Sequence, residues 1–252
     1  MALGGVFMSD TDGNIGTNST TSTEKVTGLL FDISKQAKFF EEGAGLAVKD
    51  KLQGNVIEIN SMDDLKELGI AAPSDDPKND LLFGVPYYHI NHFFSIQGDN
   101  GRLFIMFANC GADWNAIDQM QHAAHGMINQ LGVWTEQSLW KQTDPEAGTY
   151  SIDLVADLQS KASSLADENA PLSILLNANS AVIATSDEPV KKVELAKIPT
   201  CITNARFVTV LLSQGLDKDV SAMQLANPNL TPVGNIGAAL GCVALASVQE
   251  SF

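Results

Sequence analysis

Two pairs of histidines are the residues of this sequence whose type and spacing come closest to a metal site. His89 and His92 are three residues apart, and so are His122 and His125, a spacing that lets two imidazoles share one side of a helix. Neither pair has the His-Glu-x-x-His arrangement that combines a metal ion with a general base. We therefore expect all four histidines to be solvated or to lie at interfaces, and we predict neither a metal nor a cofactor.

Cys110 is the candidate nucleophile. It follows a predicted strand, at the position where α/β enzymes place reactive groups, and a histidine could activate its thiol. A cysteine is also a common small buried residue. The sequence has no Gly-x-Ser-x-Gly elbow. We expect Cys110 to be a packing residue in a protein that is not an enzyme, and the alternative is an α/β hydrolase or transferase that uses Cys110 or a His pair.

Acidic residues dominate the charge of the 252-residue chain, with 30 Asp and Glu against 15 Lys and Arg and a formal net charge of −15. Arg102 and Arg206 are the only arginines, so bidentate recognition of phosphates or bases is poorly supported and no nucleic-acid partner is expected. The three cysteines, Cys110, Cys201 and Cys242, are odd in number and widely spaced. This pattern predicts reduced thiols rather than a disulfide framework.

The order of the predicted elements indicates an α/β fold, with a mixed central sheet flanked by helices and an extended N-terminal arm. Residues 9–23 are nearly all small and polar, so we expect 1–23 to form a flexible arm and 24–252 to form one α/β domain. Apolar and β-branched runs predict strands, and helical spacing with capping residues predicts helices. The predicted strands are 26–33, 55–59, 102–107, 133–140, 172–176 and 205–212, and the predicted helices are 61–69, 81–94, 114–131, 154–165 and 236–248.

The last predicted helix, 236–248, carries small residues on one face. Gly237, Gly241 and Ala244 recur at helical spacing, which lets another backbone approach closely. This helix is also the longest apolar stretch of the chain, and it is shorter than the roughly 20 residues that a membrane helix needs. We therefore predict a close-packing helix and no membrane partner.

Several segments, taken in order, resemble contractile tail sheath proteins of myophages and related contractile injection systems. They are the polar N-terminal arm, the Ser61–Ile70 segment, and the aromatic helix His89–Phe94 that precedes the strand 102–107. The strand 205–212 and the terminal helix 232–248 complete the resemblance, which spans most of residues 24–252.

The resemblance implies a structural subunit that assembles as hexameric rings stacked helically around an inner tube. Contraction of this lattice would drive the tube through a target envelope. The implied partners are other copies of the chain, an inner tail tube protein, and baseplate and tail terminator proteins. The implied location is a virion tail or injection particle that is assembled in the bacterial cytoplasm.

Extended arms are the feature of this family that links neighbouring subunits, because an added strand forms backbone hydrogen bonds with a partner's sheet. The residues expected to serve as the assembly arm here are Val6, Phe7, Met8 and Ile15. Sheath proteins usually continue beyond the small-residue helix with a region that faces the tube. Since this chain stops at Phe252, we expect a fragment or a shortened sheath-like component.

Overall fold

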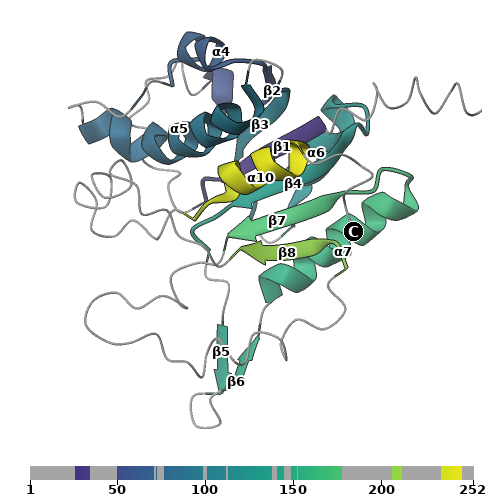
Figure 1. Ribbon diagram of the computed structural model, residues 1–252. Coiled ribbons are helices and arrows are strands. Elements are labelled where there is room, and N and C mark those ends of the chain that lie inside the picture. Colours follow the sequence, from purple (N-terminus) through teal and green to yellow (C-terminus); the bar gives the residue numbers. More distant parts are fainter. Residues whose placement is uncertain are drawn as a thin grey trace, which may run out of the picture.

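A six-stranded mixed sheet lies at the centre of the computed structural model (Figure 1), with strand order β2-β3-β1-β4-β7-β8. The edge strand β2 runs antiparallel to β3, and the other strands are parallel. The strands are β1 (Val26–Asp32), β2 (Val56–Ile59), β3 (Leu103–Ala108), β4 (Ile128–Trp134), β7 (Ser173–Asn177) and β8 (Val208–Leu211). The structure describes residues 26–34, 50–70, 72, 77–98, 101–111, 113–137, 141–144, 149–151, 153–177, 206–211 and 234–245.

Helices cover both faces of this sheet, as expected for a parallel arrangement whose strands are buried on both sides (Figure 1). All seven residues of β1 are buried, and successive side chains contribute to opposite layers. Leu29 and Phe31 pack in the layer formed with α5 and α10, whereas Leu30 packs in the layer formed with α6 and α7. These helices are α5 (Pro77–Gln97), α6 (Asn115–Ala123), α7 (Asp153–Asp167) and α10 (Ile236–Leu245).

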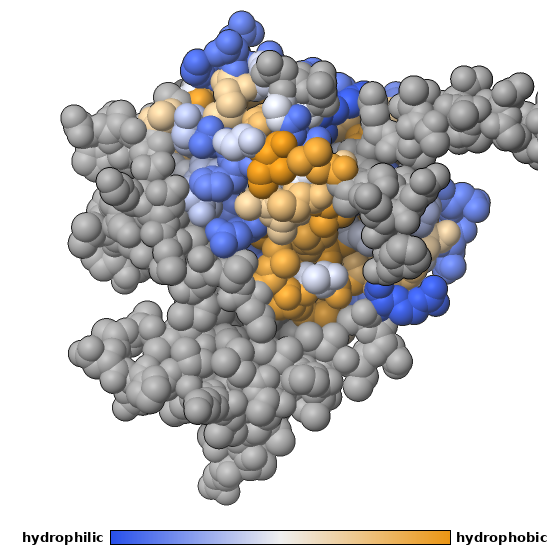
Figure 2. All heavy atoms as spheres, in the orientation of Figure 1, coloured by the Kyte–Doolittle hydropathy of each residue, from blue (hydrophilic) through white to orange (hydrophobic). Residues whose placement is uncertain are grey.

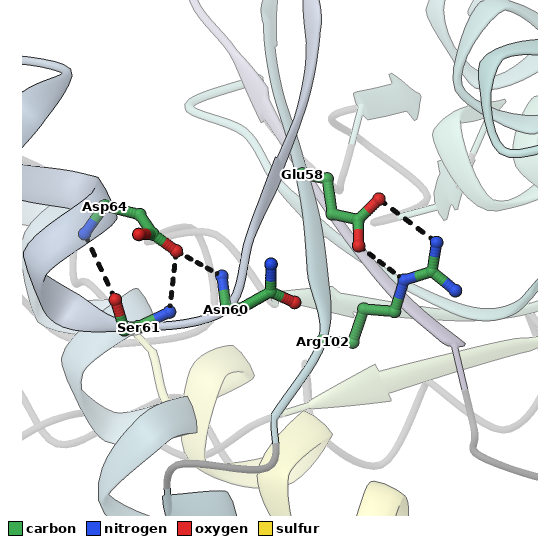
Figure 3. Close-up of polar contacts among 5 residues, drawn as sticks. All are labelled: Glu58, Asn60, Ser61, Asp64 and Arg102. Carbon is green, nitrogen blue, oxygen red and sulfur yellow. Dashed lines mark hydrogen bonds and ion pairs between the residues drawn. The ribbon is translucent and has the colours of Figure 1, made fainter.

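The short helix α4 (Met62–Glu67) begins at Ser61, as the sequence indicates. The Ser61 hydroxyl accepts a hydrogen bond from Asp64 N at 3.2 Å, and the Asp64 carboxylate accepts from Ser61 N at 3.1 Å and from Asn60 N at 2.8 Å (Figure 3). This reciprocal capping box satisfies amide groups that a helix start leaves unpaired. It fixes the direction in which the chain leaves β2.

An ion pair links the edge strand β2 to the start of β3. The Arg102 guanidinium donates from Nε to Glu58 Oε1 at 2.6 Å and from Nη2 to Glu58 Oε2 at 3.1 Å (Figure 3). The same guanidinium lies over the Phe104 ring, with Cζ 5.2 Å from the ring centroid. The bidentate geometry helps to specify the register of the one antiparallel pair in the sheet.

The predicted α/β fold is confirmed, and so are most of the predicted elements. The strands predicted near 26–33, 55–59, 102–107, 172–176 and 205–212 correspond to β1, β2, β3, β7 and β8, and four of the five predicted helices are present with shifted ends. The N-terminal arm 1–23, including Val6, Phe7, Met8 and Ile15, lies outside the described residues. No helix in the described part of the chain is long and apolar enough to cross a membrane.

The predicted helix 114–131 is wrong in its second half. Helix α6 ends at Ala123, and β4 occupies 128–134, so the strand predicted at 133–140 starts and ends earlier than expected. The reversal occurs at His125 and Gly126, both with positive φ. Gly126 N donates to Gln121 O at 2.8 Å and His125 N donates to His122 O at 3.1 Å, which is the Schellman arrangement.

A two-stranded antiparallel ribbon follows β4 and has no counterpart among the predicted elements. It consists of β5 (Lys141–Asp144) and β6 (Thr149–Ser151), with a register shift between Gln142 and Asp144. The ribbon forms a separate sheet from the central one.

Replacing His125 by glycine should stabilise the protein. His125 has φ 53°, in the left-handed region that costs a side-chain-bearing residue about 1 kcal/mol and that glycine adopts freely. We therefore expect His125→Gly to raise the free energy of unfolding by about 1 kcal/mol in urea titrations. The matched control is His122→Gly, which places glycine inside α6 and should lower stability by about 1 kcal/mol. A loss of stability in His125→Gly would contradict the expected relief of strain.

Candidate functional site

The carboxyl ends of β1, β3, β4 and β7 meet at one edge of the sheet, and this edge is where ligands bind in many doubly wound folds. β1 lies between β3 and β4, so the chain turns in opposite directions from β1 to reach its two neighbours. Polar residues stand at these strand ends although the strands themselves are apolar. Asp32 ends β1, Thr135 follows β4, and Asn177 ends β7.

Asp32 is the centre of this edge, with 1% of its surface exposed. Its Oδ2 accepts hydrogen bonds from Thr135 Oγ1 and Gln137 Nε2, each at 2.7 Å, and from Ser34 Oγ at 3.0 Å. Its Oδ1 accepts from Ser34 N at 3.0 Å and from Cys110 N at 3.3 Å. Five donors from the segments after β1, β3 and β4 therefore converge on one carboxylate.

A second pair extends this network to β7. Thr135 N donates to Asn177 Oδ1 at 3.1 Å, and Asn177 Nδ2 donates to Thr135 O at 3.3 Å. Both residues are buried, so their polar groups need partners within the protein. Together, the Asp32 carboxylate and the Asn177 amide join the carboxyl ends of four neighbouring strands. Donors from within the protein occupy both oxygen atoms of the Asp32 carboxylate. The carboxylate therefore holds the loops that follow β1, β3 and β4 in position.

Backbone strain occurs beside this network. Trp114 directly precedes α6, has φ 50° and is buried. Its backbone N–H donates to Cys110 O at 3.3 Å. A left-handed conformation is unfavourable for a bulky side chain and persists where the surroundings enforce it. The indole of Trp114 lies in the core layer with α6 and α7, so burial of this side chain holds the β3–α6 loop in place.

Cys110 lies within this edge but is poorly suited to nucleophilic attack. Burial raises the pKa of its thiol well above the ordinary value, and the nearby negative charge of Asp32 raises it further. The Sγ atom lies 3.8 Å from Ala108 O, which accepts the weak S–H hydrogen bond. The thiolate is the reactive form of cysteine, so this environment keeps Cys110 in the unreactive thiol form at neutral pH.

Cysteine alkylation should distinguish Cys110 from Cys242. Cys242 is exposed on α10, whereas Cys110 is buried with a raised thiol pKa. On treatment of the folded protein with iodoacetamide at pH 8, we expect peptide mass spectrometry to find Cys242 modified and Cys110 protected. In 6 M guanidinium, where the protein is unfolded and both thiols are exposed, Cys110 and Cys242 should both react. Rapid modification of Cys110 in the folded protein would instead indicate an accessible, activated thiol.

The four histidines lie in two different environments. His122 and His125 are exposed at the end of α6, in agreement with the expectation of solvated side chains. His92 is partly buried, and its Nδ1 lies 2.8 Å from Tyr88 O. For His89 the expectation of a solvated ring is wrong, because it is fully buried and Gly237 N donates to its Nδ1 at 3.4 Å. Among the described residues, no three His, Cys, Asp or Glu side chains cluster as metal ligands would.

The burial of His89 follows from the close crossing of α5 and α10. A Cβ atom placed on Gly237 would lie 1.9 Å from His89 O, and one on Gly241 would lie 3.0 Å from Ile96 Cβ. Gln97 Nε2 donates to Gly241 O at 2.6 Å across the same contact. Ala244, one turn further along α10, is partly buried against this layer. The small residues of α10 therefore face the backbone of α5.

An apolar surface lies over α10 and the neighbouring strands β7 and β8 (Figure 2). Val243 and Leu245 on α10 are 41% and 60% exposed, and Leu211 on β8 is partly exposed. Beside this surface, β8 pairs with β7 on one side, and no described strand pairs with it on the other. An edge strand of this kind can add a strand from another chain.

No protein-family model matches the sequence, and no curated protein matches it significantly.

Proposed function

We propose that this chain is a structural subunit of a contractile tail sheath, which assembles into stacked hexameric rings around an inner tube. The order of the elements in the sequence suggests this family, and an α/β domain with a mixed sheet agrees with it. In this role the chain would contact other copies, the tube, and the baseplate and terminator proteins. It would then lie in a virion tail or injection particle. Subunit surfaces would perform the work rather than a catalytic centre.

The observation that carries this proposal is the β8 edge next to the apolar surface of α10. Val208–Leu211 is a short strand with a described partner on one side, and Val243 and Leu245 expose apolar area nearby (Figure 2). A strand arriving from another subunit would gain backbone hydrogen bonds from this edge, and its side chains would cover part of the apolar area. Backbone pairing of this kind links subunits without requiring a rigid interface.

The pairing of β8 with β7 identifies the backbone groups available to such a strand. Ile174 N donates to Phe207 O at 2.7 Å, and Ile174 is the register partner of Val208. In a parallel pair, alternate residues of each strand face the partner. Thr209 and Leu211 therefore direct their N–H groups toward β7. Val208 and Val210 direct theirs toward the open edge.

Replacing Val210 by proline should prevent assembly without unfolding the domain. Proline removes the outward N–H of residue 210, and proline is tolerated in edge strands when this group does not pair within the sheet. We expect the purified protein, co-expressed with the genes adjacent to its own, to form rings or striated tubes in negative-stain electron microscopy. The Val210→Pro variant should remain monomeric in the same experiment.

Val210→Ala is the matched control, because it removes both γ-methyl groups of the valine but keeps the N–H group. It should still assemble, and circular dichroism should show both variants to be folded. Assembly by Val210→Pro equal to that of the control would rule out strand addition at β8. A monodisperse monomer for the unsubstituted protein in the co-expressed preparation would argue against the sheath function itself.

A further inference from the structure

The crossing of α5 and α10 encloses a histidine, the side chain whose charge changes near neutral pH. His89 on α5 is fully buried, and Gly237 N on α10 donates to its Nδ1 at 3.4 Å. A ring nitrogen that accepts a hydrogen bond carries no proton, so the proton of this imidazole is on Nε2 and the ring is neutral. The contact between the two helices therefore requires the neutral form of His89.

A second polar group is buried in the same layer. The indole Nε1 of Trp134 on β4 is buried and has no hydrogen-bond partner among the described residues. The centroid of the Phe31 ring lies 6.3 Å from that of His89 and 6.5 Å from that of Trp134. Phe31 and Trp134 pack in one layer with Ile236 and Leu240 of α10. A buried donor without an acceptor is costly, so access of water to the indole N–H would offset part of the cost of moving α10 away.

The titratable neighbours of His89 on its own helix are aromatic. The Tyr88 ring lies 5.3 Å from the His89 ring, and the His92 ring lies 4.2 Å from the Tyr88 ring, in each case between centroids. The charged residues of α5, Lys78 and Asp80, precede His89 by more than two helical turns. Helix α5 therefore places no carboxylate beside the imidazole.

The elements packed against α5 contribute one carboxylate, that of Asp32 at the end of β1. All five hydrogen bonds of Asp32 go to the network at the sheet edge, and none goes to His89. Strands β3, β4 and β7 contain no charged residue, and α10 contains Cys242 as its one titratable side chain, on the exposed side. A positive charge on His89 would therefore face no carboxylate from these strands and α10.

Protonation of His89 opposes the contact between the helices. Protonated Nδ1 is a donor that would face the Gly237 N–H group, and the positive charge would be buried. An imidazole in water takes up a proton near pH 6.5. Because the closed contact holds the neutral ring, the open form binds the proton more tightly, and acid shifts the equilibrium toward it. The closed contact is favoured above about pH 6.5 and is lost progressively below this value.

We propose that His89 is a pH-sensitive switch that releases α10 from α5 under mildly acidic conditions. Release would break the Gly237–His89 and Gln97–Gly241 hydrogen bonds. The strand pairs of the central sheet do not include α10, so the sheet would stay folded. The switch is a property of a single chain, and this proposal does not depend on the sheath function.

Amide hydrogen exchange of the full chain between pH 7.5 and pH 5.5 tests the proposal, with rates corrected for the intrinsic effect of pH. Uptake of one proton on opening lowers the protection of α10 by about tenfold over this range. We expect this loss in peptides that cover 236–245, and unchanged protection in β1 and β3. Unchanged protection of α10 would overturn the proposal. An equal loss in α10 and the strands would also overturn it, because it would indicate unfolding of the whole domain.

Two variants identify the group that titrates. His89→Asn keeps an acceptor near the position of Nδ1 but cannot take up the proton, so its α10 protection should be the same at both pH values. His92→Asn is the matched control one turn further along α5, and it should keep the tenfold change. A pH response that persists in His89→Asn, or that disappears in His92→Asn, would overturn the proposal.

A measurement on the unsubstituted protein covers the case in which His89→Asn does not fold. Hydrogen exchange at the imidazole C2 position, followed by peptide mass spectrometry, reports the protonation of each histidine separately. His89 should become protonated at lower pH in the folded protein than in 6 M guanidinium, because opening of the helix contact must come first. Protonation at the same pH in both states would overturn the proposal.

Discussion

Gly237→Ala is expected to destabilise the folded protein by about 3 kcal/mol or more. The added Cβ would lie 1.9 Å from His89 O and 2.6 Å from His89 C, and these are backbone atoms that cannot rotate away. The helices α5 and α10 would have to separate, with loss of the Tyr88–Asn235 and Gln97–Gly241 hydrogen bonds. Urea unfolding followed by circular dichroism measures the change.

Gly241→Ala is the matched control on the same helix. Its Cβ would meet Ile96 Cβ at 3.0 Å and Phe93 O at 3.2 Å, contacts that small shifts can relieve. The higher helix propensity of alanine, worth about 1 kcal/mol, also offsets part of the cost. We expect this variant to lie within about 1 kcal/mol of the unsubstituted protein. Equal losses in the two variants would show that the α5–α10 crossing does not depend on Gly237.

Asp32→Asn is expected to cost about 3 kcal/mol, because it replaces the charged acceptor of five hydrogen bonds by an amide with one acceptor atom. The new NH₂ group would replace one of the two oxygens. At the Oδ2 position it would face Gln137 Nε2, and at the Oδ1 position it would face the backbone N–H groups of Ser34 and Cys110. The donors on that side would lose their acceptor. The loss should appear as a lower urea midpoint with an unchanged slope.

Asp113→Asn is the control for this experiment, since Asp113 is exposed on the nearby β3–α6 loop. It should leave the midpoint unchanged. Hydrogen exchange measures the effect locally. Backbone amides at the carboxyl ends of β1, β3 and β4 should lose protection from exchange in Asp32→Asn. An Asp32→Asn variant as stable as the control would mean that the network does not hold these strand ends together.

The fold class could be predicted because buried parallel strands and capped helices leave strong local patterns. Five of the seven residues of Val26–Asp32 are apolar or glycine, and Ser61 caps the helix that the sequence predicts there. The error at α6 and β4 has a physical cause. Ile128 and Leu131 belong to a strand buried on both faces, and they continue the helical spacing of Ile117 and Met120 by coincidence.

Gly132 shows that a tertiary contact, rather than a helix end, can be the reason for a glycine. Gly132 directly follows the predicted helix 114–131, where a glycine is typical of a helix stop. It lies instead inside β4, where a Cβ would come within 2.5 Å of Ile236 Cγ2 and 2.6 Å of Leu240 Cδ1. The glycine is needed because α10 packs onto the strand at this point. The true stop is at Gly126, which follows His125 in the Schellman turn.

The Asp32 network could not be derived from local sequence, because its donors are far along the chain. Thr135 and Gln137 are separated from Asp32 by 103 and 105 residues. One signal was available, since Asp32 and Asn177 are polar residues at the carboxyl ends of apolar strands.

The central position of β1 also determines when the sheet can form during synthesis. β1 pairs with β3 and β4, and Thr27 and Gln130, which share a hydrogen bond, are 103 residues apart. β1, the first strand among the described residues, therefore has no partner in the central sheet until β3 has left the ribosome, and it is not enclosed until β4 follows. Long-range pairing of this kind slows folding. The nascent chain exposes an apolar strand throughout this interval, which makes it prone to aggregation before the sheet forms.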